Sequence, residues 1–107
     1  MSKYLFIESR DPFESPDVKQ QWELATALAG KGNQVTMFLV QNGVFAARKG
    51  ARVETLDASS GVTVLADELS LAERAIHADA VRDGVGVRAI DALTDLLMEE
   101  GCKPIWT

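Results

Sequence analysis

Cysteine and histidine are almost absent from this sequence. Its 107 residues include a single cysteine, Cys102, and a single histidine, His77. One cysteine cannot form an internal disulfide, which is consistent with a reducing compartment. One thiol and one imidazole are also too few for a zinc site built from several Cys and His ligands, so we expect no metal.

The chain also lacks long hydrophobic runs and an excess of positive charge. The apolar runs at Tyr4–Ile7 and Val35–Val40 are far shorter than the roughly 20 residues of a membrane-spanning helix. The net charge is −5, and the 11 Lys and Arg residues are scattered, so no basic stripe could follow a phosphate backbone. The first residues do not resemble a secretory signal. We therefore expect a cytoplasmic protein that binds neither membranes nor nucleic acid.

Nucleotide-binding motifs are missing as well. The sequence contains no G-x-G-x-x-G and no G-K-[ST] pattern. Asp67 and Lys103 superficially resemble the aspartate and lysine of a phospho-accepting receiver domain. The first predicted strand, however, is followed by Ser9 and Arg10 after Glu8, without the adjacent acidic pair of such a domain. We expect no cofactor.

Apolar β-rich runs alternate with helix-patterned segments along the whole chain. This alternation predicts an α/β fold with a parallel sheet covered by helices, and the length predicts a single domain over residues 1–107. The last two predicted strands contain Gly or Pro, so both are expected at sheet edges. The predicted strands are residues 4–7, 35–40, 61–66, 85–88 and 104–106.

Capping signals define the predicted helices. Ser15 suits the N-cap of the first helix, with Pro16 at the first helical position, and Asp91 suits the cap of the last helix. Glycines are expected to end both helices, because Gly accepts the left-handed C-cap geometry. The stretch from Gly50 to Ser60 is weakly patterned. The predicted helical segments are residues 15–29, 44–48, 68–76 and 91–100.

Ligands of open α/β sheets bind beyond the carboxyl ends of the strands, so the loops after the first three strands are the candidate site. Capping and solvated-turn roles remain the alternative for their polar residues, and Ser70 has no His nearby to activate it. The candidate ligand-binding residues are Asp11, Glu14, Gln41, Asn42, Gly43, Asp67, Glu68, Ser70 and Arg74.

Cys102 is the candidate catalytic residue, because only a thiol can carry sulfur as a persulfide. Such chemistry needs a thiolate, which neighbouring cations favour. Cys102 follows the end of a predicted helix, where the helix dipole opposes a thiolate, although Lys103 partly offsets this effect. The alternative is a half-buried apolar residue that leads into the last strand.

The order of these motifs resembles the DsrE/DsrF/DsrH-like family of sulfur-relay proteins, which includes the TusBCD and YchN types. In that family the second strand leads into a Q-D-G-V-x-x-A turn, and Gln41–Ala47 differs from it by Asn42 in place of the acidic residue. Val62–Leu65 with Leu71–Ala75 is similar to the third strand and the following helix. The ending Pro104–Trp106 is more like the DsrH/TusB branch.

The resemblance implies a three-layer α/β/α sandwich with a mostly parallel five-stranded sheet, assembled into dimers, trimers or hexamers or into a hetero-complex with other sulfur-relay subunits. It also implies that sulfur carriers of the family have a cysteine in the loop after the third strand. By alignment Ser70 falls at about that position.

We therefore expect a non-catalytic subunit or binding protein of a sulfur-relay system. Two alternatives stay open. One is a sulfur carrier, a sulfurtransferase, that uses Cys102. The other is a small-ligand-binding protein on the same fold, because fold does not determine function.

Overall fold

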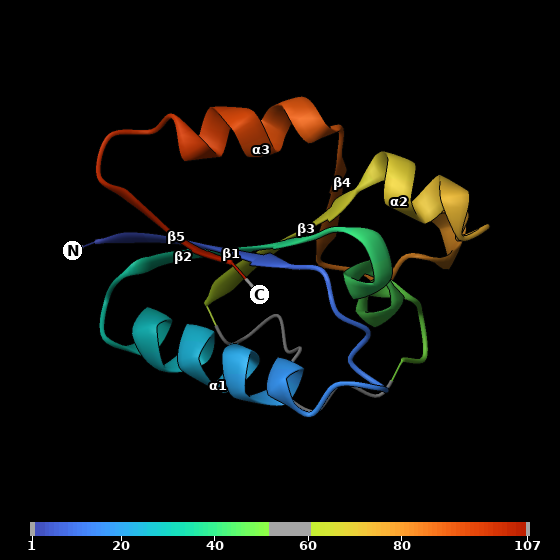
Figure 1. Cartoon of the computed structure of the whole chain (residues 1–107), viewed down its shortest axis with the longest axis horizontal. Coiled ribbons are helices and arrows are strands. Elements are labelled where there is room, and N and C mark those ends of the chain that lie inside the picture. Colours follow the sequence, from blue (N-terminus) through green and yellow to red (C-terminus); the bar gives the residue numbers. More distant parts are fainter. Residues whose placement is uncertain (1, 52–60, 107) are drawn as a thin grey trace.

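A five-stranded sheet forms the centre of the computed structural model, which describes residues 2–51 and 61–106. Its order is β4-β3-β2-β1-β5, and every neighbouring pair is parallel (Figure 1). The predictions that the last two strands lie at the edges and that the sheet is parallel are confirmed. The strands are β1 (Lys3–Glu8), β2 (Gln34–Leu39), β3 (Val62–Asp67), β4 (Val85–Arg88) and β5 (Cys102–Trp106).

Helices cover both faces of this sheet, as a parallel sheet requires. Figure 1 shows α1 (Asp17–Gly30) on one side and α3 (Ile90–Leu97) on the other. This arrangement confirms the predicted three-layer fold. The remaining helical segments are α2 (Glu68–Glu73) and the 3₁₀ helices η1 (Gln41–Ala47) and η3 (Ala78–Ala80).

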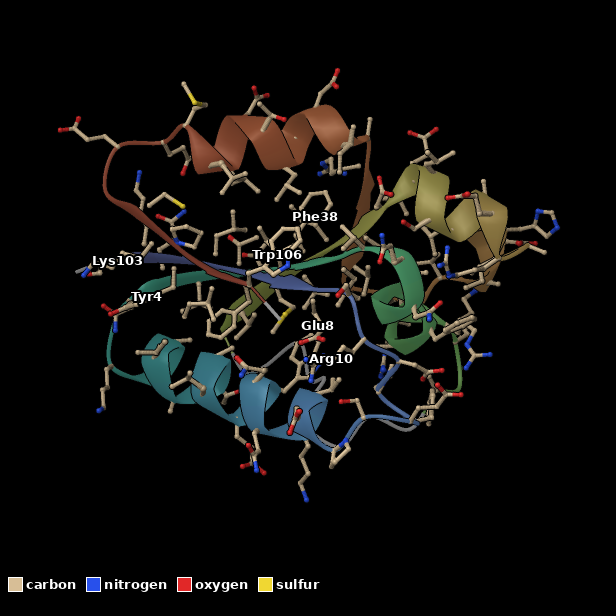
Figure 2. All side chains as sticks on the ribbon, in the orientation of Figure 1. Tyr4, Glu8, Arg10, Phe38, Lys103 and Trp106 are labelled. Carbon is tan, nitrogen blue, oxygen red and sulfur yellow. The ribbon has the colours of Figure 1, made fainter. Side chains whose placement is uncertain are left out.

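Two hydrophobic clusters lie on opposite faces of the sheet. The larger one packs Trp22 of α1, which is fully buried, against Phe6 and Met37. The smaller one packs Leu93 of α3 against strand residues that include Phe38, on the α3 side of the sheet (Figure 2). The strict alternation of β1 and β2 side chains between these clusters explains why both strands read as continuous apolar runs.

The predicted caps of α1 and α3 are wrong by one or two residues. The N-cap position of α1 is Pro16, which already has helical φ and ψ, and not Ser15. The N-cap position of α3 is Ala89, whose backbone is extended, so Asp91 lies inside the first turn. There its carboxylate interacts favourably with the positive end of the helix dipole.

The other two helical predictions are also corrected. The helix expected to reach Ile76 ends at Glu73, because Ala75 has a φ of +54° and cannot continue it. The segment expected to start at Val44 starts at Gln41, so the predicted turn is part of a 3₁₀ helix. Beyond Ala51, the weakly patterned stretch lies outside the described residues. No helix in the described part of the chain is long and apolar enough to span a bilayer.

Candidate functional site

The carboxyl ends of β2 and β3 bring two of the predicted loops together. In this parallel pair Leu39 lies opposite Ala66, so the residues that follow the two strands emerge at the same edge of the sheet. η1 begins after β2, and α2 begins directly after β3. Figure 1 shows both segments at the same end of the sheet.

A chain of hydrogen bonds joins the two loops. The backbone N–H of Gln41 donates to Ser70 Oγ at 2.8 Å, and Ser70 Oγ donates to Asp67 Oδ2 at 2.6 Å. Asp67 Oδ2 also accepts the backbone N–H of Ser70 at 3.1 Å, which caps α2. Asp67 and Ser70 are only 6% and 4% exposed. Both side chains are therefore held in one orientation within the protein.

Arg74 forms a second link between the same segments. Its Nε donates to Asn42 Oδ1 at 3.1 Å, and its guanidinium also donates to the carbonyl oxygen of Ser70 at 3.2 Å. The guanidinium carbon lies 6.0 Å from the ring centre of Phe45. The group made of Gln41, Asn42, Asp67, Ser70 and Arg74 is called the carboxyl-edge network below.

Tight backbone geometry supports this network. Gln41 has a φ of +49°, which is unusual for a residue with a side chain, and its N–H is the donor to Ser70. Gly43 lies directly against the carbonyl oxygen of Glu8, where a Cβ atom would overlap with it. Gly43 therefore contributes to the site by its lack of a side chain, and its N–H donates to the carbonyl oxygen of Val40.

Three predicted ligand-binding side chains, those of Asp11, Glu14 and Glu68, lie outside the carboxyl-edge network. Asp11 Oδ1 accepts the backbone N–H of Phe13 at 2.8 Å, which orders the loop after β1, and Glu14 is exposed in the same loop. Glu68 is exposed at the start of α2. With Asp67 it lines a separate hollow between α2 and the start of α3.

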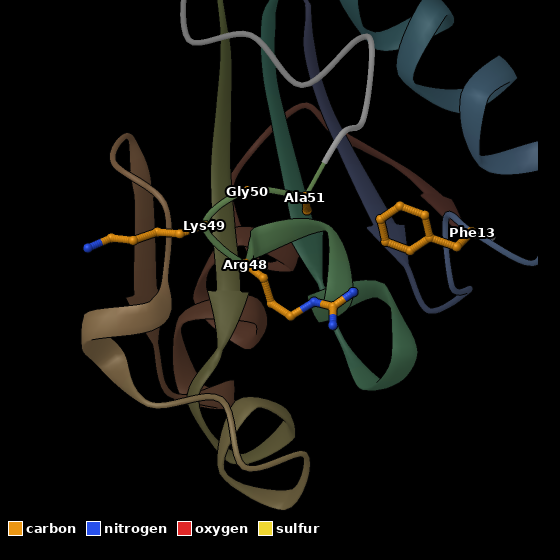
Figure 3. A pocket seen from close by; sticks show the side chains of 5 residues that line it. All are labelled: Phe13, Arg48, Lys49, Gly50 and Ala51. Carbon is orange, nitrogen blue, oxygen red and sulfur yellow. The ribbon is translucent and has the colours of Figure 1, made fainter.

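A cationic and aromatic cluster beside the network has no counterpart among the predicted residues. The guanidinium carbon of Arg48 lies 5.0 Å from the ring centre of Phe45 and 5.7 Å from that of Phe13. Figure 3 shows Arg48 extended toward Phe13, whereas Lys49 points away. An open hollow of about 440 Å³ is lined by Phe13, Arg48, Lys49, Gly50 and Ala51. Only the i to i+3 spacing of Phe45 and Arg48 could have indicated this contact.

Cys102 lies at the other end of the sheet. It begins β5 and pairs with Lys3, the first residue of β1, whereas the network lies beyond the last residues of the strands. Burial raises the pKa of the Cys102 thiol, Glu99 raises it further, and Lys3 opposes them by lowering it. At the same edge Lys103 Nζ lies 5.5 Å from the ring centre of Tyr4 (Figure 2). The structure thus separates Cys102 from all the candidate ligand-binding loops.

The fold and the polar carboxyl edge define an α/β protein of the DsrE type. The model of the DsrE/DsrF-like family matches residues 2–101, so this chain belongs to that family. Membership supports a role related to sulfur relay in general terms. The resemblance noted in the sequence is confirmed.

Solved structures agree with this fold at low sequence identity. The ychN protein of E. coli is 20% identical, with a TM-score of 0.82 over 98% of this chain and 100% of its own. MTH1491 of Methanobacterium thermoautotrophicum is 18% identical, with a TM-score of 0.80 over the full length of both chains. BT1422 of Bacteroides thetaiotaomicron is 18% identical, with a TM-score of 0.80 over 99% of this chain and 95% of its own. No curated protein matches the chain.

Proposed function

We propose that this chain is an assembly or binding subunit of a sulfur-relay system and does not carry sulfur itself. The observation that supports this proposal is the state of Ser70. It occupies the position where the family resemblance places the sulfur-carrying cysteine, and it is buried and hydrogen-bonded to Asp67. A hydroxyl group cannot form a persulfide, and this hydroxyl already serves to join β3, α2 and η1.

The alternative carrier, Cys102, is poorly suited to sulfur transfer. A persulfide forms when a thiolate attacks a sulfane sulfur, so the reaction needs an ionised and accessible thiol. Burial and the nearby Glu99 raise the pKa of Cys102, which reduces its thiolate fraction at neutral pH. The side chain also packs against the hydrophobic cluster on the α3 side of the sheet.

Sulfur loading tests this proposal directly. The reduced protein is incubated with inorganic polysulfide and weighed intact by mass spectrometry, followed by treatment with a reductant. We expect no reductant-sensitive gain of a sulfur atom in the unmodified chain. A gain that disappears in Cys102→Ser would overturn the proposal and establish Cys102 as a carrier.

A second variant separates the identity of residue 70 from its surroundings. Ser70→Cys in a Cys102→Ser background places the only thiol at the position implied by the family. Position 70 is only 4% exposed and its side chain lies against the Asp67 carboxylate, which opposes a thiolate, so we expect no more sulfur uptake than in Cys102→Ser alone. Sulfur uptake by the double variant would show instead that this position accepts sulfur and that only the missing thiol prevents the chain from carrying it.

The assembly role is supported by apolar side chains on the α3 side. Trp106 is 70% exposed and pairs with Ile7, whose side chain faces α3, and Met98 at the end of α3 is 80% exposed. Large exposed apolar groups on one side of a small domain are typical of a contact surface. We propose that this side forms the contact in a cytoplasmic homo-oligomer or in a hetero-complex with other sulfur-relay subunits.

Light scattering coupled to gel filtration tests this surface. Trp106→Glu is expected to reduce the mass of the assembly, because a charge would be buried in the contact. Leu24→Glu on α1 is the control, since Leu24 is 43% exposed on the opposite side of the sheet. A homo-oligomer that survives Trp106→Glu but dissociates in Leu24→Glu would place the contact on the α1 side.

A further inference from the structure

Two arginines meet at one phenylalanine ring beside the carboxyl-edge network. The guanidinium carbons of Arg48 and Arg74 lie 5.0 and 6.0 Å from the ring centre of Phe45. Phe45 is half-buried and packs against the hydrophobic cluster on the α1 side of the sheet, so the core fixes the position of its ring. Two positive charges are therefore held near one ring in a protein whose net charge is −5.

The guanidinium of Arg48 is held in one orientation. Its Nε donates to the carbonyl oxygen of Phe45 at 3.1 Å, and its carbon also lies 5.7 Å from the ring centre of Phe13. Neither Nη1 nor Nη2 donates to a described residue, and neither is among the buried side-chain atoms that lack a partner, so both are accessible. The edge formed by these two nitrogens therefore presents its N–H groups to a ligand.

No carboxylate of the described residues is paired with either arginine. The ion pairs found in this part of the chain involve neither Arg48 nor Arg74. Arg74 donates instead to two uncharged oxygens, those of the Asn42 side chain and the Ser70 backbone. Positive charges held near one another repel, so an anion supplied by a ligand would be attracted to both guanidinium groups.

The open hollow at Phe13 gives a ligand access to this edge. Its volume of about 440 Å³ suits a small molecule. Figure 3 shows the guanidinium of Arg48 directed toward the Phe13 ring, which is 54% exposed, whereas the Lys49 side chain points the other way. The wall is fixed by backbone hydrogen bonds, because the N–H groups of Lys49 and Arg82 donate to carbonyl oxygens of η3 and η1 at 2.7 and 2.8 Å.

We propose that this hollow binds a small aromatic carboxylate, with the carboxylate on the Nη1–Nη2 edge of Arg48 and the ring against the exposed side of Phe13. The two nitrogens of a guanidinium edge match the two oxygens of a carboxylate, and such charged pairs are stronger than neutral hydrogen bonds. An aromatic ring on the ligand gains contact area and ring stacking. The proposal is independent of a sulfur role, because it uses neither Ser70 nor Cys102.

Titration of ¹⁵N-labelled protein by NMR tests the ligand class. The probes are benzoate, benzamide and acetate at constant pH and ionic strength. We expect saturable shifts from benzoate at Phe13, Phe45 and residues 48–51, and at the side-chain Nε–H signal of Arg48. Binding should be about tenfold weaker for benzamide, which lacks the charge, and for acetate, which lacks the ring. Benzoate that binds no more tightly than either of the other two, or that shifts signals elsewhere, would overturn the proposal.

Charge variants separate the Arg48 edge from a general attraction of anions. Arg48→Gln is expected to weaken benzoate binding at least about tenfold. Arg48→Lys keeps the charge but loses the paired geometry, and should weaken binding by a smaller factor. Lys49→Gln is the matched control, because it removes the same charge from a side chain that points away from Phe13, and should change the affinity less than about twofold. Equal losses in Arg48→Gln and Lys49→Gln would sink the assignment.

Phe13→Ala tests the apolar half of the site. Phe13 is exposed and belongs to neither hydrophobic cluster, so the variant should fold. We expect its affinity for benzoate to fall about tenfold, to that of acetate. If Arg48→Gln does not fold, this variant decides the matter, and unchanged benzoate binding in Phe13→Ala would exclude the hollow as the site.

Discussion

The two ends of the same sheet differ in what their polar residues do. At the carboxyl end, Asp67 and Ser70 are buried and joined to Gln41 by short hydrogen bonds. At the amino end, Cys102 lies near Glu99 and Lys3, whose ion pair spans 3.8 Å with both side chains more than 40% exposed. The carboxyl end is an ordered polar site, whereas the amino end is a half-exposed surface with a thiol.

This difference follows from the geometry of parallel sheets. The loops that leave the carboxyl ends run directly into helix starts, where backbone N–H groups need acceptors, and Asp67 supplies one. The strands enter the amino edge from glycine-containing turns such as the one at Gly101, where a side chain would meet open space. A polar network is therefore expected at one end and loose packing at the other.

Matched glycine substitutions at the two ends should show the largest contrast. Gly43→Ala forces a methyl group onto the carbonyl oxygen of Glu8 and is expected to lower the free energy of unfolding by about 3 kcal/mol or more. Gly101→Ala places a methyl group in open space at a φ of +79° and should cost only about 1 kcal/mol. Urea unfolding measures both, and equal losses would contradict the contrast between the two ends.

Carboxylate substitutions should give an intermediate contrast. Asp67→Ala removes the cap of α2 and leaves the buried Ser70 hydroxyl without its acceptor, so we expect a loss of about 2 kcal/mol. Glu99→Ala removes only an exposed ion pair and should cost less than about 1 kcal/mol. The same unfolding experiment compares them, and a larger loss for Glu99→Ala would reverse the ranking of the two ends.

The smallest expected effect is on the thiol. The rate of Cys102 alkylation, followed against pH, should have a midpoint above that of an ordinary cysteine, because burial and Glu99 raise its pKa. Glu99→Gln should lower that midpoint and Lys3→Gln should raise it. Since the folded-state pKa is the higher one, folding stability should also fall slightly as the pH rises from the unfolded to the folded thiol pKa. A midpoint below the ordinary value would contradict this environment.

Local pattern was a good guide to the elements and a poor guide to their ends. The runs around Phe6 and Phe38 predicted central strands correctly, because residues buried on both faces must be apolar. The end of α2 was missed, since the positive φ of Ala75 comes from how the chain turns after the helix and not from a glycine. The cap at Asp91 was misplaced because an acidic residue suits both the cap and the first turn.

The candidate site was predicted only as a set of separate loops. Ser70 and Gln41 are 29 residues apart, so no local pattern could show that the N–H of one donates to the hydroxyl of the other. The burial of Asp67 Oδ1 without a donor among the described residues, and the contact between Arg48 and Phe13, depend likewise on neighbours that are distant in sequence.

The sequence by itself determined the layered parallel fold, the family and the absence of a thiol after β3, because these depend on local alternation and on residue identity. Only the tertiary structure decided which loop residues meet and that Cys102 lies at the opposite edge from them. It also decided that one oxygen of Asp67 is buried without a hydrogen-bond donor among the described residues. The reason is that strand register and helix placement, rather than spacing along the chain, determine the neighbours of each polar group.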